Sequence, residues 1–166
     1  MKISILGNNL SALTLAKILS KKKIKVDIIS ENKKALFLNS SRTIGITQSN
    51  ISYLEENFNG IKNLGHNIDK ITISTFRQKN DVLNFSSSKN YQFSVFEYKK
   101  IYQYLNSYVN KDKNIKTLTK NFDNNFLNNK FLNKYNIIID TNLNNPLSRK
   151  FFSKKIEKDY FSKAFV

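Results

Sequence analysis

Apolar positions near the N-terminus change their spacing twice, which indicates three successive elements. Residues 3–6 form a short, nearly continuous apolar run, typical of a strand that is covered on both faces. Residues 12–19 place apolar side chains on one side of a helix, and 26–29 predict a second strand. A strand–helix–strand unit joins parallel strands through a right-handed crossover, so we expect a parallel sheet here. The apolar positions of the predicted helix are Ala12, Leu15, Ala16, Ile18 and Leu19.

Two further stretches have helical spacing. Ser49 or Asn50 can cap the first of them, because both side chains accept hydrogen bonds from helix-start amides. The second runs over residues 97–109. The apolar sides of these helices carry Ile51, Leu54 and Phe58 in the first and Ile101, Leu105 and Val109 in the second.

The remaining patterned segments predict strands. Residues 70–76 and 91–96 alternate apolar and polar side chains, which is typical of half-buried strands. Residues 126–132 predict a hairpin turning at Asn128–Asn129, since asparagine accepts positive φ better than most residues. Residues 135–140 predict another buried strand. Together the patterns predict an α/β domain with a parallel core sheet and additional antiparallel strands.

Composition narrows the chemistry. The 166 residues are 40% hydrophobic and 13% aromatic, enough for one domain with a substantial core. The chain has no cysteine and a single histidine, His66, which excludes disulfides and thiolate zinc sites and makes histidine-rich metal sites and conventional catalytic triads improbable. No apolar run approaches the length of a membrane span, so we expect a cytoplasmic protein.

The formal net charge is +16, from 28 Lys and Arg against 12 Asp and Glu. Lysine, asparagine, isoleucine and phenylalanine are all frequent while glycine and proline are scarce, a joint shift typical of AT-biased coding. We therefore expect no sequence-specific nucleic-acid partner. Attraction to an acidic membrane, at the inner face and weakening with added salt, follows from the charge alone.

The segment ILGNNLSALTLAKIL (residues 5–19) lies where a dinucleotide-binding protein has Gly-x-Gly-x-x-Gly. In that turn the first glycine makes the bend, the second admits the pyrophosphate and the third allows close helix packing. Gly7 fills the first position, Asn9 the second and Ala12, an accepted substitute, the third. The side chain of Asn9 occupies space that the pyrophosphate would approach. The pattern therefore has two interpretations, a weakened phosphate-binding turn or a plain strand-to-helix connection.

An acidic residue near the end of the following strand commonly binds the ribose hydroxyls of a dinucleotide. Ser30 and Glu31 both fall near this position. Glu31 is the better candidate, because one carboxylate can accept two hydroxyl hydrogen bonds. The alternative is a solvated charge just past a strand end.

Several segments together resemble the ubiquinone-biosynthesis hydroxylases, the 2-polyprenyl-6-methoxyphenol hydroxylase relatives among FAD-dependent aromatic-ring monooxygenases. RTIGIT at 42–47, followed by SNISYLEENF, is similar to the family's Arg-Ala-Ile-Ala-Leu-like segment before a helix. YNIIID at 135–140, followed by NNPLSRK, is similar to the strand that leads into Ala-Asp-Gly-x-x-Ser-x-x-Arg. The matching segments keep their order over essentially the whole chain.

The resemblance implies a Rossmann-like FAD/NAD(P)-binding domain over residues 1–166, the N-terminal portion of a flavin monooxygenase. In the family NAD(P)H reduces the flavin, and O₂ is then used to hydroxylate a polyprenylated phenol, chemistry that the cofactor carries. Arg42 would pair with phosphate, unless it is an ordinary exposed loop cation. The cofactor-facing residues implied are Gly7, Asn9, Ala12, Ser30, Glu31 and Arg42.

The departures from the family pattern define the alternatives. Thr141 replaces the glycine of the Asp-Gly pair, and the family's C-terminal part with its second Gly-Asp motif is absent. We therefore expect a truncated or degenerate FAD-binding portion, inactive alone, whose partner is a C-terminal half or another ubiquinone-pathway protein. The alternative is a non-catalytic structural or assembly domain that keeps the fold without tight FAD binding.

Overall fold

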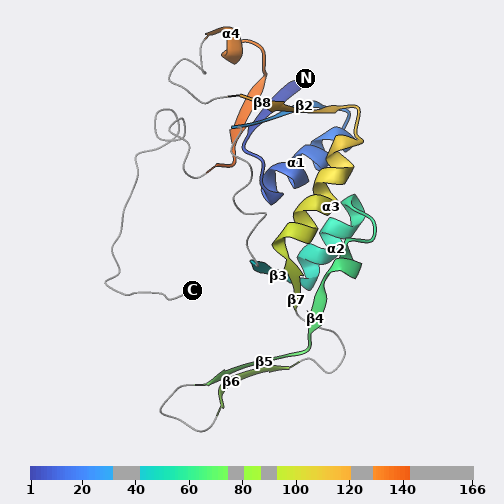
Figure 1. The fold of residues 1–166 in the computed structure, drawn as a ribbon, viewed down its shortest axis with the longest axis vertical. Coiled ribbons are helices and arrows are strands. Elements are labelled where there is room, and N and C mark those ends of the chain that lie inside the picture. The colour runs from blue at the N-terminus through green and yellow to red at the C-terminus, as the bar shows by residue number, and fades with distance from the viewer. Residues whose placement is uncertain (32–41, 75–80, 87–92, 121–128, 143–166) are drawn as a thin grey trace, which may run out of the picture.

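A computed structural model describes residues 1–31, 42–74, 81–86, 93–120 and 129–142. Its main sheet is parallel and contains the first strand of the chain (Figure 1). The strands of this sheet are β1 (Lys2–Leu6), β2 (Lys25–Ser30), β8 (Ile115–Thr119) and β9 (Ile137–Asp140). They are hydrogen-bonded in the order β8-β2-β1-β9, and all three pairings are parallel. The predicted α/β class with a parallel core is confirmed.

The side chains of this sheet alternate between two apolar layers. Helix α1 (Leu10–Lys21) and helix α3 (Tyr98–Asn110) pack against each other and against one face (Figure 1). Ile28 belongs to this layer, whereas its neighbour Ile29 belongs to a second layer with Tyr135. Successive side chains of a strand point to opposite faces, so burial on both sides explains why the neighbours Ile28 and Ile29 of β2 are both apolar.

A second, antiparallel sheet leads directly into α3 (Figure 1). Its strands are β3 (Thr43–Thr47), β7 (Phe93–Glu97) and β4 (His66–Ile68), in the order β3-β7-β4. Helix α2 (Gln48–Asn57) and the short 3-10 helix η2 (Ile61–Leu64) connect β3 to β4. A separate hairpin of β5 (Lys70–Ser74) and β6 (Asp81–Ser86) extends away from the helices. No helix within the described ranges is long and apolar enough to cross a bilayer.

The predicted helices form, but their details differ. The cap of α2 is Thr47, with extended backbone, so the prediction of Ser49 or Asn50 is wrong. Strand β3 ends at Thr47 and the helix begins at the next residue, which places both predicted caps inside the first turn. Ile51 and Phe58 are buried as predicted.

The buried side of α1 is rotated from the predicted one. Its buried residues are Ala12, Leu13, Ala16 and Ser20. Leu15, Ile18 and Leu19 are only partly buried, because the buried side of the helix is formed by three small residues and Leu13. The predicted apolar side of the helix, with Leu15, Ile18 and Leu19, is therefore not the side that is fully buried.

Two strand predictions are corrected. Residues 126–128 lie outside the described ranges, but Asn129–Leu132 form the short helix α4 and not a hairpin strand. Its Phe131 packs on the Tyr135 ring, with centroids 5.0 Å apart, which fixes a helical turn at this place. Ile73 of β5 is 46% exposed, so that strand is not half-buried. The single histidine, His66, is exposed and lies in β4.

Candidate dinucleotide-binding site

The connection between β1 and α1 has the shape of a glycine turn. Gly7 has a φ of +112°, in the region that favours glycine, and its amide donates to the Ile29 carbonyl at 2.8 Å. A Cβ atom at this position would lie 2.5 Å from Thr141 Oγ1. Conformation and space therefore both require glycine here, in the role predicted for the first glycine of the motif.

Asn9 closes the next position of the turn. It is the N-cap of α1, and its Oδ1 accepts a hydrogen bond from the Ala12 amide at 2.9 Å. Its Nδ2 donates to the Thr141 carbonyl at 2.7 Å. The side chain thus occupies one amide that a phosphate would otherwise receive, and it spans the gap to the strand on the other side. Ala12 itself is fully buried, which suits the predicted close packing.

Two amides at the start of α1 have no partner within the helix. Leu10 and Ser11 occupy the first two helical positions, where a backbone N–H has no partner within the helix. The first turn of α1 contains no acidic side chain, so its partial positive charge is not neutralised from within that turn. The helix start therefore keeps two of the donors that bind a diphosphate in this type of fold.

The loop after β9 is joined to the turn. The amide and the hydroxyl of Thr141 both donate to the Leu6 carbonyl, each at 2.9 Å. Because β1 lies between β2 and β9, the carboxyl ends of β1 and β9 flank the crevice where open α/β sheets bind ligands. The contact between Asn9 and Thr141 bridges this crevice.

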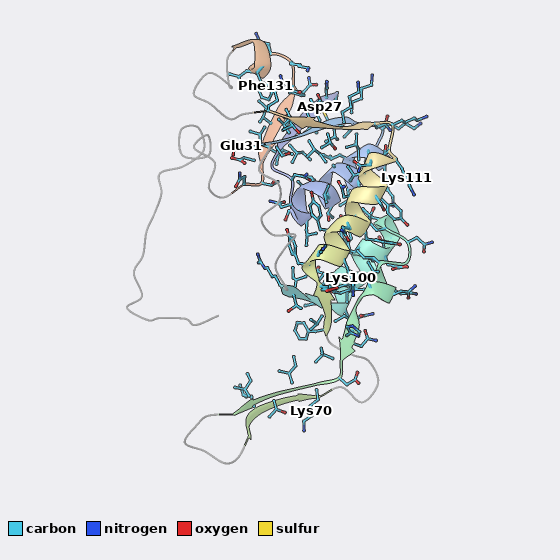
Figure 2. The ribbon with its side chains drawn as sticks, in the orientation of Figure 1. Asp27, Glu31, Lys70, Lys100, Lys111 and Phe131 are labelled. Carbon is cyan, nitrogen blue, oxygen red and sulfur yellow. The ribbon has the colours of Figure 1, made fainter. Side chains whose placement is uncertain are left out.

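Ser30 and Glu31 lie at the same edge of the sheet. Leu6 pairs with Ile29, so the residues that follow β2 lie beside the turn that follows β1. Figure 2 shows Glu31 at this end of β2, and its side chain is half-buried. The Ser30 carbonyl accepts a hydrogen bond from the Lys120 amide at 2.9 Å, within the pairing of β2 and β8. The predicted ribose position is thus next to the predicted phosphate position.

Arg42 lies directly before β3 of the second sheet. It is exposed, and its guanidinium carbon lies 5.4 Å from the centre of the Tyr98 ring, a cation–π contact. Its carbonyl accepts from the Tyr98 amide at 2.9 Å. These contacts anchor Arg42 to the junction of β3 and α3 and involve no atom of the turn.

Asn8 is a site residue that the sequence did not indicate. Its side-chain amide hydrogen-bonds the Tyr102 hydroxyl, and burial is the main cause that raises the pKa of that hydroxyl. Its Oδ1 is buried and accepts no hydrogen bond within the described part of the chain. A buried acceptor beside the turn suits a ligand hydroxyl. No motif signals it, because the second position of Gly-x-Gly accepts any residue.

An apolar groove begins at the same helix start. It has a volume of about 360 Å³ and lies between α1, β3, α2 and α3. Leu15 and Ile18, the side chains that do not face the sheet, are part of its wall. The complete lining is Leu10, Ser11, Thr14, Leu15, Ile18, Ile44, Ile46, Asn50, Tyr53, Leu54, Ile101 and Leu105.

Known proteins resemble this chain in fold. The structure of 2,6-dihydroxypyridine-3-hydroxylase from Arthrobacter nicotinovorans matches 70% of it with a TM-score of 0.53 and 17% identity. HpxO of Klebsiella pneumoniae, complexed with FAD and uric acid, matches 70% with a TM-score of 0.54 and 14% identity. The p-nitrophenol 4-monooxygenase PnpA from Pseudomonas putida DLL-E4 matches 69% with a TM-score of 0.57 and 10% identity. No protein-family model and no curated protein matches the sequence.

The matched region is a minor part of each neighbour. It corresponds to 28% of the Arthrobacter hydroxylase, 30% of HpxO and 30% of PnpA. At these identities the likeness concerns the fold. The chain has the Rossmann-like α/β fold, with a parallel core and an added antiparallel sheet, that occurs in hydroxylases and monooxygenases, including one solved with FAD.

Proposed function

We propose that this chain is the dinucleotide-binding portion of a flavin-dependent aromatic hydroxylase, and that it holds the ADP part of FAD at the carboxyl edge of the parallel sheet. The observation that carries the proposal is the turn itself. A glycine with a φ of +112° joins a buried strand to a helix start whose first two amides have no partner within the helix, beside an acidic residue at the end of the next strand.

The residues present fit this group in part. The amides of Leu10 and Ser11 would donate to the diphosphate, and the missing Cβ of Gly7 keeps the bend tight. Glu31 would accept the ribose hydroxyls, and Asn8 Oδ1 offers a further acceptor. When bound, FAD supplies the redox chemistry of ring hydroxylation. The fit is weakest at Asn9, whose side chain occupies the amide of Ala12.

The finer assignment follows the resemblance of the sequence. We propose a polyprenylated phenol of ubiquinone biosynthesis as substrate, NAD(P)H as reductant and a cytoplasmic location at the inner face of the membrane. The remainder of such an enzyme, on this polypeptide or on a partner, would contribute the flavin and substrate contacts. The apolar groove along α1 offers a surface for it, and we expect tight FAD binding only when that remainder is present.

A second candidate function is a non-catalytic structural or assembly domain. The observation that favours it is the bridge from Asn9 to Thr141, which joins the two loops that a bound diphosphate would separate. Such a domain needs the fold but no open crevice.

Titration with FAD, followed by flavin fluorescence, separates the two candidates. Saturable binding at micromolar FAD, competed by ADP, supports the proposal, and no binding up to millimolar FAD supports the second candidate. Ser11→Asp provides a matched test of the position, because Ser11 is exposed and an acidic residue in the first turn suits the helix dipole. The variant should fold normally and lose FAD binding through repulsion of the diphosphate. Full FAD affinity in Ser11→Asp would contradict binding at this turn.

A further inference from the structure

Exposed lysines gather at the amino ends of the parallel strands, the edge opposite the candidate nucleotide site. They come from three separate connections, α1 to β2, α3 to β8 and α4 to β9. Helices of the crossovers run antiparallel to the strands, so their C-terminal ends meet at this edge. We name this set the amino-edge lysines: Lys21, Lys22, Lys23, Lys25, Lys111, Lys113 and Lys134.

The carboxylates near this edge are mostly engaged inside the fold. Asp27 is 2% exposed, pairs with Lys2 Nζ at 2.8 Å and accepts from the Tyr135 hydroxyl at 2.7 Å. Asp112 pairs with Lys17 Nζ at 2.8 Å. Glu56 is exposed at the end of α2, and it is the backbone carbonyl of this residue that receives Lys21 Nζ. The amino-edge lysines therefore leave a strong excess of positive charge at this surface.

Helix dipoles account for part of this pattern, since Lys22 and Lys111 are the C-caps of α1 and α3. Cations near the C-terminus of a helix are favourable only within its last turn. Lys21 is the basic residue in the last turn of α1, and the last turn of α3 has none. Lys25, Lys113 and Lys134 lie outside the helices. The charge thus extends along the edge beyond the two helix ends.

Two exposed apolar side chains lie at the same edge. Met1, next to the start of β1, is 66% exposed, and Ile137, the first residue of β9, is 46% exposed. Aliphatic side chains among lysines suit an interface with lipid, where the apolar groups enter the headgroup region. Single-stranded nucleic acid is instead bound through exposed aromatic rings. Tyr53 is an exposed aromatic ring, but it lines the apolar groove and does not lie at this edge.

We propose that the amino-edge lysines bind the anionic phospholipid headgroups of a membrane surface. The choice of a membrane over another polyanion rests in part on the proposed function, because a polyprenylated substrate resides in the bilayer. The strands place this edge roughly 15 Å from the candidate nucleotide site, at about 3.3 Å per residue over each strand. Lipid and dinucleotide therefore bind opposite ends of the sheet and do not compete.

The test compares two variants of equal charge in sedimentation with vesicles. One variant replaces four amino-edge lysines by glutamine: Lys22, Lys25, Lys111 and Lys113. The matched control replaces four exposed lysines elsewhere: Lys62, Lys70, Lys99 and Lys100. Figure 2 shows Lys111 at the sheet and Lys100 and Lys70 progressively further from it. All eight side chains are exposed, so both proteins should remain folded, as far-UV circular dichroism and thermal unfolding will show.

The unaltered chain should bind vesicles of phosphatidylglycerol and phosphatidylcholine but not vesicles of phosphatidylcholine alone, and added salt should weaken binding. The amino-edge variant should lose affinity on the order of 1,000-fold, since four lysines that each contribute about 1 kcal/mol leave the surface, while the control loses far less. If both variants lost vesicle affinity equally, net charge alone would explain the binding, and the proposal would be overturned. Tighter binding to poly(U) RNA than to the vesicles at the same salt would also overturn it.

Titration of the same variants with FAD keeps the two proposals separate. FAD affinity should be unchanged in the amino-edge variant, because none of its residues lies at the carboxyl edge. If the chain binds acidic vesicles but no FAD, the proposed function is refuted and the proposed lipid-binding surface is supported. A chain that binds FAD but no vesicles refutes the lipid surface alone.

Discussion

Replacement of Asn9 by glycine should change stability and FAD affinity in opposite directions. The side chain makes two hydrogen bonds, from the Ala12 amide at 2.9 Å and to the Thr141 carbonyl at 2.7 Å. Glycine is a tolerated N-cap residue, so losing the first bond costs about 0.3 kcal/mol. Losing the second costs about 1 kcal/mol. For a domain of this size the sum lowers the melting temperature by roughly 5 °C.

The same substitution makes the Ala12 amide available and opens the crevice between β1 and β9. One regained hydrogen bond from an amide to an ionised phosphate contributes about 1.5–3 kcal/mol. We therefore expect Asn9→Gly to bind FAD roughly tenfold to a hundredfold more tightly than the unaltered chain. Equilibrium titration by flavin fluorescence measures the gain, and ADP should show the same gain if it arises at the diphosphate.

Asn9→Asp is the matched control. Aspartate keeps an oxygen for the Ala12 amide, but it loses the donor to Thr141 and adds a negative charge where the diphosphate would lie. It should preserve the helix and abolish FAD binding. If Asn9→Gly loses stability without any gain in FAD or ADP affinity, the turn is not a diphosphate site, and the reasoning behind the proposed function fails.

Three further outcomes follow from the packing. Gly65→Ala should destabilise the fold by about 1–3 kcal/mol in urea unfolding, because its Cβ would lie 2.6 Å from the buried Phe96 ring. Phe58→Ala should cost about 3–5 kcal/mol by the same assay, since Phe58 is fully buried. Burial favours a higher pKa for Asp112, but hydrogen bonds from Lys17 and a serine hydroxyl outweigh it and hold the pKa below its ordinary 3.8. Its contribution is therefore complete above that value and lost as pH falls through the folded-state pKa, so Asp112→Asn should unfold with a weaker acid dependence.

The elements that the sequence predicted share one property, a periodic apolar pattern that burial on one side or both sides imposes. Strand β2 carries Val26, Ile28 and Ile29 on its two faces because both faces are covered, and α3 repeats apolar residues where it contacts α1. Strand β8 escaped prediction, since only its first residue, Ile115, is buried and its other side chains are largely polar or exposed. Backbone hydrogen bonds to β2 hold that strand in place, and backbone hydrogen bonding does not depend on whether the side chains are polar or apolar.

The candidate site also has features that the sequence predicts and one contact that it does not. The positions of Gly7, Ser30 and Glu31 at one edge followed from the strand–helix–strand order alone, because parallel strands end at a common edge. The contact between Asn9 and Thr141 joins residues 132 positions apart in the sequence. No local pattern records such a contact, and only the pairing of β1 with β9 brings the two residues together.

The contact also changes how the two departures from the family motifs are understood. Asn9 stands for one glycine and Thr141 for another, and taken along the sequence they are two independent losses. In the fold they are one feature, since Asn9 Nδ2 donates to the carbonyl of Thr141, whose amide and hydroxyl bind Leu6. The Asn9 side chain adds a bond to the carbonyl of residue 141, and the Thr141 hydroxyl adds a bond to the Leu6 carbonyl that a glycine could not make, so both side chains tie the ends of β1 and β9 together. The bridge is therefore better understood as a built connection between the ends of β1 and β9, which a diphosphate must open or bind beside.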